Sequence, residues 1–376
     1  MIAITNKQNC CGCSACAQRC PKQCISMQAD SEGFLYPKVD TEKCIDCHLC
    51  EKVCPVINPN EPRTPLGVYA AKNANDEVRM ASSSGGIFTC LAQRVLVDGG
   101  VVFGARWDDD WNVVHDYVEK KDDIAKFRGS KYIQSNMRDC FKEAEIFLNS
   151  GRKVLFSGTP CQLAGLTRFL RKDYDNLLKV EVVCHGVPSQ GLWKEYIAEQ
   201  TSMDGKSVHD LRTINFRDKE NGWERYNVVL EYNDGQRNVC YHGKNYWMRS
   251  FITNLNLRPS CLHCPSKCNE SCADITLGDF WGIVNFFPEK CDDKGYTMIV
   301  CHTDRGREFT KDYNKGELSF TKVVAYNKSL ACSAKENPKR KAFFRDAPKG
   351  FIKSVDNLTK EPLVLRIKLL IAKLMK

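Results

Sequence analysis

The sequence contains no long hydrophobic run. Nothing in its 376 residues is long and apolar enough to cross a bilayer, and Met1 to Thr5 show neither the basic region nor the cleavage site of a secretory signal peptide. Two nucleotide-binding fingerprints are also missing, because no G-x-G-x-x-G follows a strand and no G-x-x-x-x-G-K-S/T occurs. We therefore expect a cytoplasmic protein that lacks both the usual dinucleotide motif and a P-loop.

A net excess of positive charge is absent outside the end of the chain. Thr321 to Lys376 carry 14 Lys and Arg against 4 Asp and Glu, so this tail accounts for the net charge of +9. A nucleic-acid-binding body would carry cations and aromatic residues across a folded face, so nucleic acid is not an expected partner. Leu363 to Lys376 predicts a basic amphipathic helix. It could dock on its own body, on a partner, or peripherally on the anionic inner face of the membrane.

Cysteine, in contrast, is abundant. Twenty-two cysteines without a secretory signal belong in a reducing compartment, where thiols persist and bind metals. Eight of them spell C-x2-C-x2-C-x3-C-P twice, ending at Pro21 and at Pro55. In bacterial two-cluster ferredoxins this run gives three thiolates to one cubane cluster, and its fourth cysteine crosses to the other cluster. The rule predicts two 4Fe-4S clusters, one on Cys10, Cys13, Cys16 and Cys54 and one on Cys44, Cys47, Cys50 and Cys20.

Other interpretations of these cysteines are weaker. Structural zinc sites usually show two separated C-x2-C pairs rather than four cysteines in one run, and a disulfide scaffold fits a reducing compartment poorly. Cys11 and Cys24 lie outside the pattern, and we interpret them as neighbours of the clusters and not as ligands. The proline-rich segment from Ile57 to Pro65 predicts an extended linker after this module.

The remaining pattern alternates strands and helices. Apolar runs predict strands at Gly67–Lys72, Val101–Ala105, from Lys153 to the turn at Gly158, Leu178–Val183, Ile214–Lys219, Asn227–Tyr232 and Tyr296–Cys301. Helical spacing predicts helices at Ile87–Val97, Met137–Asn149, Gln162–Leu170 and Gly191–Glu199. Successive β-α units favour a largely parallel sheet. The predicted fold class is therefore mixed α/β, with a small bacterial-ferredoxin-like α+β module followed by an α/β body.

Two segments of the body are typical of anion binding. Ser82 to Gly86 lie before the helix at Ile87, where backbone N–H groups and hydroxyls can approach a phosphate; the alternative is helix capping by Ser84. Arg128 to Ser135 gathers donors around a glycine, and it could clamp an anion or cap the next helix. Farther along, Asp274 to Gly282 predicts a strand that runs into Asp279 and two aromatic residues. These could wall a ring-shaped cofactor or pack beneath a turn.

Further cysteines follow the ends of strands. Cys161 and Cys184 lie where open α/β sheets bind ligands. With the cysteines farther along the chain they form two possible sets of four ligands, and spacing does not decide between them. The first set is Cys161, Cys184, Cys261 and Cys264, and the second is Cys261, Cys264, Cys268 and Cys272. The second set could also bind zinc.

These features together resemble the family of beta subunits of coenzyme F420 hydrogenases and dehydrogenases, as far as about Phe320. The resemblance rests on the double cysteine run and on the motifs at Ser83–Gly86, Gly129–Tyr132, Gly158–Gln162, Cys184–Ser189, Cys261-x2-Cys264 and Asp274–Gly282. Members of that family are iron–sulfur flavoproteins, with FAD in the body and a 4Fe-4S cluster beside it. Relatives include chlorophyll-pathway reductases and proteins found beside surface-polysaccharide genes.

The resemblance implies roles for particular residues. Ser84, Gly85 and Gly86 match the loop that receives the FAD phosphates, and Lys131, Tyr132 and Ser135 match a second flavin-binding stretch. Cys161, Cys184, Cys261 and Cys264 match the ligands of the cluster beside the flavin. The implied domains are a two-cluster 4Fe-4S ferredoxin-type domain at 1–60, the family's N-terminal region at 61–145, its C-terminal region at 146–320, and a basic tail at 321–376.

The predicted function is an oxidoreductase that passes electrons between 4Fe-4S clusters and FAD. It would reduce or oxidise an organic substrate or the deazaflavin coenzyme, with surface-polysaccharide metabolism as one setting. His185 and Asp279 are the candidate residues for proton delivery. Expected partners are a small-molecule substrate and a redox partner such as ferredoxin or another oxidoreductase subunit. The alternatives are an electron-relay subunit without its own substrate and, less favoured, a regulatory redox sensor.

Overall fold

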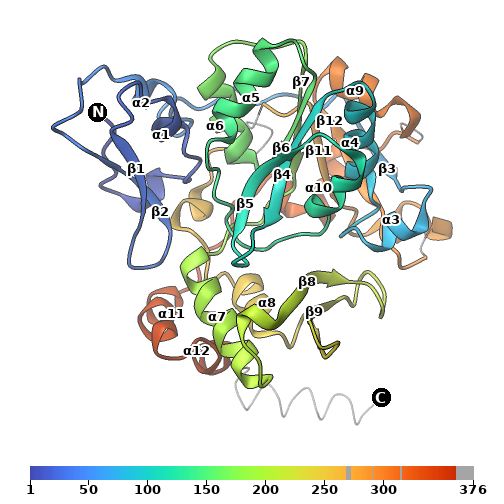
Figure 1. Cartoon of the computed structure of the whole chain (residues 1–376). Helices are drawn as coiled ribbons and strands as arrows, with labels where there is room; N and C mark the ends of the chain where they lie inside the picture. The colour runs from blue at the N-terminus through green and yellow to red at the C-terminus, as the bar shows by residue number, and fades with distance from the viewer. Residues whose placement is uncertain (268–271, 291, 314–315, 361–376) are drawn as a thin grey trace, which may run out of the picture.

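The computed structural model describes residues 1–267, 272–290, 292–313 and 316–360. These residues form a mixed α/β fold, as the sequence predicts. Figure 1 shows an N-terminal module (residues 1–60) at one side of a central sheet. A lobe that contains a smaller sheet and several helices lies below that sheet.

The N-terminal module repeats one local pattern. The short helices α1 (Ala15–Arg19) and α2 (Leu49–Lys52) each begin after a residue in the left-handed conformation, Ser14 or His48. Each helix carries the third cysteine of a C-x2-C-x2-C run. Strands β1 (Ile25–Ala29) and β2 (Leu35–Val39) lie between the two helices in the sequence and pair antiparallel with each other. The repeat in sequence is thus a repeat in structure.

The central sheet organises the body. Within the described residues it has seven strands in the order β3-β12-β11-β7-β6-β4-β5. The bounds are β3 Gly67–Ala71, β4 Val101–Trp107, β5 Val113–Val118, β6 Val154–Gly158, β7 Leu177–Val182, β11 Ile275–Asp279 and β12 Thr297–Cys301. Neighbours β4, β6, β7 and β11 are parallel, which confirms the expected β-α units. Strands β5 and β12 are antiparallel to these four. Strand β5 returns from β4 through a tight turn around Asp108, and β12 pairs with β11.

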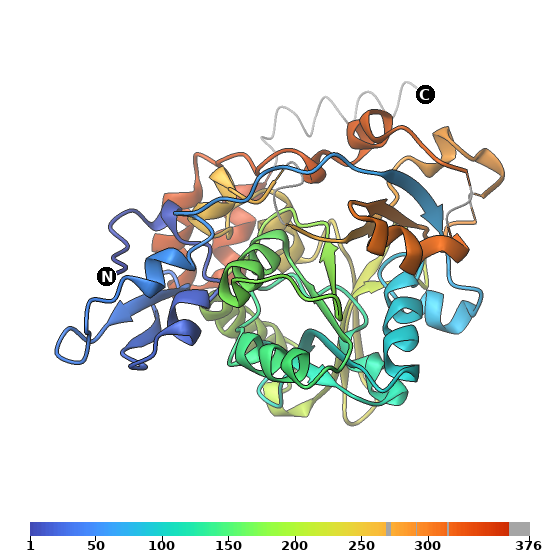
Figure 2. The ribbon, with the colours of Figure 1, turned by 90° about the horizontal axis from the view of Figure 1, so that it is seen from above.

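Helices cover both faces of the sheet. Alternate residues of β4 point to opposite sides: Val101 and Phe103 belong to one apolar cluster, and Val102 belongs to another. Helices α5 (Cys140–Asn149) and α6 (Pro160–Leu170) pack on the first face, and α4 (Ile87–Val97) packs on the second. The shorter helices are α3 (Asp76–Met80), α9 (Asp304–Thr310) and α10 (Phe320–Tyr326). In Figure 2 the N-terminal module lies on the side of α5 and α6, and residues of α1 contact both helices.

The lower lobe has its own aromatic core. Its strands β8 (Leu211–Asp218), β9 (Asn227–Tyr232) and β10 (Arg237–Tyr241) form an antiparallel sheet. Its helices are α7 (Gln190–Met203), α8 (Tyr246–Ile252), α11 (Arg340–Asp346) and α12 (Phe351–Thr359). Trp193, Trp247 and Phe351 pack together inside it. Part of the basic tail is therefore an integral layer of this lobe, whereas the predicted helix Leu363–Lys376 lies outside the described residues.

The predicted helices of the body form close to their expected positions. Helix α4 begins and ends as predicted, and α5 begins three residues later than expected, at Cys140. Among the helices that the structure describes, none combines the length and apolar character that a membrane span needs.

Candidate functional site

The N-terminal module gathers its eight predicted ligands into two groups. Each group surrounds one small hollow, and each hollow takes one cysteine from the other run, as the crossover rule predicts. The inner hollow, next to the body, is lined by Cys10, Cys13, Cys16 and Cys54. The outer hollow is lined by Cys20, Cys44, Cys47 and Cys50.

Cys11 and Cys24 lie beside these groups. Cys24 lines the outer hollow, with its sulfur 3.3 Å from that of Cys20. Cys11 is buried and lines the inner hollow, and its thiol is within hydrogen-bond reach of Cys13 and of Cys161. Cys11 therefore connects the inner hollow to the body.

The structure brings a third group of cysteines together from distant segments. Cys161 is the second residue of α6, Cys184 follows β7, and the other two lie on the turn Pro259–His263 and just after it. Each of these thiols lies within electrostatic range of at least one other of the group, and burial contributes to a raised pKa in all four. The group is Cys161, Cys184, Cys261 and Cys264. Of the alternative set, Cys272 is buried, whereas Cys268 lies outside the described residues.

A cavity of about 440 Å³ opens at the carboxyl ends of the parallel strands. Its walls include Gly158 at the end of β6, Val183 after β7 and Gly278 in β11. This is the edge at which open α/β sheets bind ligands, and the volume is typical of organic-ligand pockets, about 300–1,000 Å³. Cys184 and His185 also line the cavity, so the third cysteine group adjoins it.

The predicted phosphate loop forms one wall of this cavity. A Cβ added at Gly85 would lie 2.5 Å from Ala71 O and from Thr297 N, so only glycine fits between β3 and β12. Gly86 has φ +82° and is the N-cap of α4 without a side-chain cap. Ser84 donates its hydroxyl to Tyr296 O at 2.6 Å, so the alternative of helix capping by Ser84 is wrong.

Two buried basic residues, Lys219 and Arg79, hold the predicted phosphate loop in place through hydrogen bonds and an ion pair. Lys219 Nζ donates to three carbonyl oxygens, of Arg79, Ser84 and Lys294, at 2.7–2.9 Å. Arg79 is fully buried and makes a two-bond ion pair with Asp292. The loop is thus held by contacts to segments more than a hundred residues away.

The second predicted flavin-binding stretch lies against the first. The N–H and hydroxyl of Ser130 donate to Ser83 Oγ at 2.6 and 2.9 Å. Lys131 donates to the carbonyls of Arg128 and Gly129, and burial lowers its pKa to about 7. Tyr132 lines the cavity as well, and its hydroxyl accepts from Arg217 Nη1 at 3.2 Å.

Ser135 belongs to a buried polar network that sequence reasoning missed. Its Oγ lies 2.8 Å from His115 Nδ1 and accepts from Gln162 Nε2 at 2.8 Å. His115 Nε2 lies 3.0 Å from Ser157 O and donates to it. Burial lowers the pKa of His115 to about 4, so its ring is neutral at pH 7. The sequence does contain one sign of this network, because a histidine follows the two valines that begin β5 and so lies in a buried part of the strand.

The two candidate proton donors have different surroundings. His185 Nε2 donates to Asn254 Oδ1 at 2.6 Å, its Nδ1 lies 3.4 Å from Ser329 Oγ, and burial lowers its pKa. Asp279 accepts from Arg217 Nη1 at 2.6 Å and from Trp223 Nε1 at 3.1 Å. His185 therefore has its second ring nitrogen beside Ser329, another residue that lines the cavity, whereas the carboxylate of Asp279 is held in an ion pair.

Arg217 is a second residue that the pattern did not single out. Its side chain is 2% exposed and lines the cavity, and its Nε and Nη2 have no hydrogen-bond partner among the described residues. Its guanidinium lies over Tyr226, and Trp281 stacks on Trp223 with ring centroids 4.4 Å apart. Of the predicted aromatic pair, Trp281 lines the cavity and Phe280 packs in an apolar cluster. The sequence offers no signal for Arg217, because β8 (L-R-T-I-N-F-R-D) carries several other polar residues.

Comparison with protein families covers most of the chain. A family described as the C terminus of the coenzyme F420 hydrogenase/dehydrogenase beta subunit matches residues 151–325, and its N-terminal counterpart matches residues 68–142. The chain belongs to this family of beta subunits. A 4Fe-4S dicluster domain matches residues 9–58, so this family member also carries an iron–sulfur domain. The predicted family is confirmed.

Individual relatives of this family member are distant. One subunit of the F(420)H(2) dehydrogenase of Methanosarcina mazei is 20% identical over 312 residues, which cover 77% of this chain and 82% of that protein. Coenzyme F420-dependent sulfite reductase of Methanocaldococcus jannaschii is 23% identical over 317 residues, 81% of this chain and 46% of that protein. A chain of the F420-reducing [NiFe] hydrogenase complex from Methanosarcina barkeri aligns in structure with a TM-score of 0.46 and 17% identity, covering 79% of this chain and 91% of that one.

Proposed function

We propose that this chain is an iron–sulfur flavoprotein oxidoreductase that passes electrons between 4Fe-4S clusters and FAD to reduce or oxidise an organic substrate or the deazaflavin coenzyme. One observation carries the proposal: the candidate sites form an unbroken series. The outer and inner hollows share one module, Cys11 lies between Cys13 and Cys161, and Cys184 lines the cavity. Such a series suits electron transfer, which needs neighbouring centres.

The residues present fit iron–sulfur clusters. Each hollow is lined by its four predicted ligands and one further cysteine, the third group supplies four cysteines, and thiolate is the ligand that Fe–S clusters use. The third ligand set is proposed to be Cys161, Cys184, Cys261 and Cys264. Val187 N donates to Cys261 Sγ at 3.4 Å, a backbone bond of the kind that tunes cluster potentials.

The cavity fits FAD. The predicted loop residues Ser84, Gly85 and Gly86, together with Ser83 and Lys131, would hold its phosphates, because they supply hydroxyls, a backbone that approaches closely, and a cation. The unpaired Nε and Nη2 of Arg217 are donors that lack an acceptor among the described residues. When bound, clusters pass single electrons, whereas a flavin stores two and transfers a hydride.

The chain's own residues then handle protons and position groups. We assign proton delivery to His185, because it lines the cavity and its Nδ1 is 3.4 Å from the Ser329 hydroxyl. Asp279 instead orients Arg217 and Trp223, although it was also a candidate for proton delivery. His115 holds Ser135 in place as a neutral ring.

Iron, sulfide and flavin analysis of one anaerobically purified sample tests the proposal. Three cubane clusters predict about twelve irons with matching sulfide, and one FAD per chain. About eight irons together with zinc and no flavin would instead identify a ferredoxin module fused to a binding domain. In that case the oxidoreductase proposal fails.

A second candidate is an electron-relay subunit without its own substrate. The observation that favours it is that a relative is named as one subunit of a dehydrogenase, and a subunit works with partners. Turnover of the deazaflavin coenzyme by the isolated chain, with dithionite as reductant, would exclude the relay. Turnover only after addition of a second subunit would support it.

A further inference from the structure

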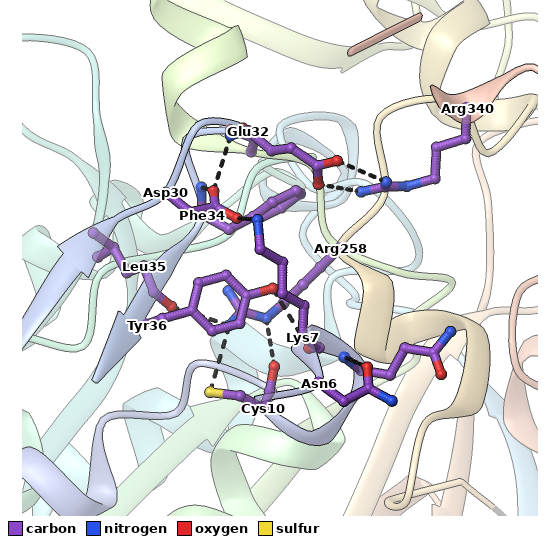
Figure 3. Close-up of polar contacts among 12 residues, drawn as sticks. Asn6, Lys7, Cys10, Asp30, Glu32, Phe34, Leu35, Tyr36, Arg258 and Arg340 are labelled. Carbon is purple, nitrogen blue, oxygen red and sulfur yellow. Dashed lines mark hydrogen bonds and ion pairs between the residues drawn. The ribbon is translucent and has the colours of Figure 1, made fainter. Parts of the chain in front are cut away.

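Arg258 joins the N-terminal module to the body at the point where two cysteine groups meet. It precedes the turn that carries Cys261, and its side chain reaches into the module (Figure 3). Its Nε donates to Cys10 O at 2.7 Å and its Nη2 to Leu35 O at 3.0 Å. Nη2 also lies 3.5 Å from Cys10 Sγ, and the guanidinium carbon is 4.2 Å from the centroid of the Tyr36 ring.

The charge of Arg258 is buried without a carboxylate. Its side chain is 0% exposed, and within residues 1–267, 272–290, 292–313 and 316–360 no acidic group forms an ion pair with it. The other deeply buried arginines do have such partners, in the pairs Arg79–Asp292, Arg217–Asp279 and Arg340–Glu32, each with a closest distance of 2.6 Å. A buried charge without a counter-charge is strongly unfavourable, so the surroundings of Arg258 call for a negative group.

The groups that surround Arg258 indicate where this negative charge resides. Cys10 belongs to the inner hollow, and Cys161 and Cys261 of the third group lie within electrostatic range of the guanidinium. The remaining contacts, with backbone carbonyls, the Gln134 amide and an aromatic ring, are neutral. Cysteine thiolates around an iron–sulfur cluster would supply the missing charge from both sides.

We propose that Arg258 is the counter-charge of the inner ferredoxin-type cluster, and that it raises the reduction potential of this cluster above that of the outer one. The proposal rests on the cluster ligands of the proposed function. A cluster becomes more negative when it is reduced, so a buried cation and an N–H donor to sulfur stabilise the reduced form. Arg258 is thus a positioning residue that acts through charge.

The outer hollow lacks this arrangement among the residues that the structure describes. Cys47 is exposed, and Lys22, which lines the hollow, is exposed as well, so water screens its charge. The ammonium group of Met1 is already paired with Asp46 and Glu51. One electron from an external carrier of the ferredoxin class would reduce the outer cluster first. That electron would then pass to the inner cluster, which oxidises the outer one, and no bond is made or broken.

Redox titration of the anaerobically reconstituted full chain, followed by electron paramagnetic resonance, tests the proposal. Arg258→Gln removes the charge, Arg258→Lys keeps it, and Arg340→Gln is the matched control. Arg340 also bridges the module and the body, through Glu32, but its hydrogen bonds go to that carboxylate and to Leu257 O and not to a cysteine (Figure 3). We expect R258Q to shift one ferredoxin-type signal to a more negative potential. R258K should shift it much less, and R340Q should not shift it.

The outcomes separate this proposal from the proposed function. An R258Q protein with full iron and unchanged potentials would overturn it, as would an equal shift in R340Q, because either would mean that the charge of Arg258 does not act on the cluster. If R258Q folds by circular dichroism but loses about four irons, retention of those irons in R258K supports the counter-charge, and their loss in R258K refutes it. A wild-type chain without clusters would instead refute the proposed function.

Discussion

The cysteine hollows of the N-terminal module and the cavity of the body are built in opposite ways. Each hollow takes its cysteines from two short runs within one module, whereas the cavity takes its walls from segments between Ser82 and Ser329. The hollows are lined by sulfur and apolar groups, whereas the cavity adds hydroxyls, amides and cations to a largely apolar wall. A compact inorganic group can be enclosed by local loops, whereas an extended organic molecule needs donors from a whole fold. Changes in one region should therefore spare the contents of the other.

Breaking the link between the two regions should have the largest effect. We expect Cys161→Ala to lose about four of about twelve irons, because each cubane holds four, and to lose electron transfer from the module to the flavin. FAD itself should stay bound, because Cys161 does not line the cavity. Iron analysis and anaerobic flavin bleaching with reduced ferredoxin measure both effects.

The matched control for this prediction is Cys332→Ser, at an exposed cysteine of the described chain. It should keep full iron and normal flavin reduction. Unimpaired flavin reduction in C161A would remove Cys161 from the proposed ligands of the third cluster.

Acid should weaken the cavity region through a buried histidine. The pKa of His115 is lowered from 6.5 to about 4 by burial. Between pH 4 and pH 6.5 the unfolded chain binds a proton at His115 that the folded chain does not. The contribution of this group to the free energy of unfolding is therefore fully present above pH 6.5 and is lost as the pH falls toward 4. The loss is about 3 kcal/mol in free energy of unfolding. Thermal unfolding at pH 7 and pH 5 should show a smaller drop for His115→Gln than for wild type.

His302 provides the comparison for this histidine. Burial also lowers its pKa to about 4, but it does not line the cavity. His302→Gln should remove a similar part of the acid sensitivity without changing FAD affinity, whereas H115Q should weaken FAD binding through Ser135. Equal FAD affinity in both variants would argue that the His115 network has no role in the cavity.

FAD affinity should also depend on pH, whereas iron content should not. Because the pKa of Lys131 is about 7, its ammonium form dominates below pH 7 and is lost above it. A phosphate needs the charged form, so affinity should fall by up to about tenfold per pH unit above 7. Fluorescence titration with FAD from pH 6 to pH 9 measures this. Lys131→Arg should bind with a flat profile and Lys131→Met weakly at every pH; a persistent slope in K131R would point to another group.

The smallest effect is expected at the contact that packs the two regions together. Arg19 of α1 donates through Nη1 to both oxygens of Glu145 on α5, at 3.0 and 2.8 Å, and both side chains are about one quarter exposed. Partly exposed pairs contribute at most about 1 kcal/mol. A double-mutant cycle with Arg19→Ala and Glu145→Ala, followed by thermal unfolding, should give a coupling of that size with unchanged iron and flavin. A much larger coupling would mean that the module docks chiefly through this pair.

The same contrast explains what the sequence could predict. The module's cysteine groups follow from spacing, because Cys10, Cys13 and Cys16 lie within one short segment that can close on only one hollow. Helix α4 follows from its apolar period and the glycines before it. The third group did not follow from spacing, because Cys161, Cys184 and Cys261 meet only after the sheet is assembled, and only the family resemblance selected it.

Arg217, Arg258 and His115 were not predicted for a related reason. Each is a polar residue whose role depends on burial and on partners from other elements, and composition cannot show either. The packing of Phe343 and Phe351 into the lower lobe was hidden by the positive charge of the surrounding tail. Charge describes the exposed face of α11 and α12, whereas their buried face decides where they lie.

Lys219 gives the cavity one more property. Its ammonium group has three hydrogens, and three carbonyls from different places in the chain take all of them. These three bonds hold the proposed phosphate loop in one arrangement, so we expect ligand binding there to lose little conformational entropy and to keep more of the contact energy as affinity. The arrangement is tetrahedral, whereas a guanidinium is flat. The shape of the lysine head group therefore matters here as well as its charge, and we expect Lys219→Arg to lose part of this set of three bonds.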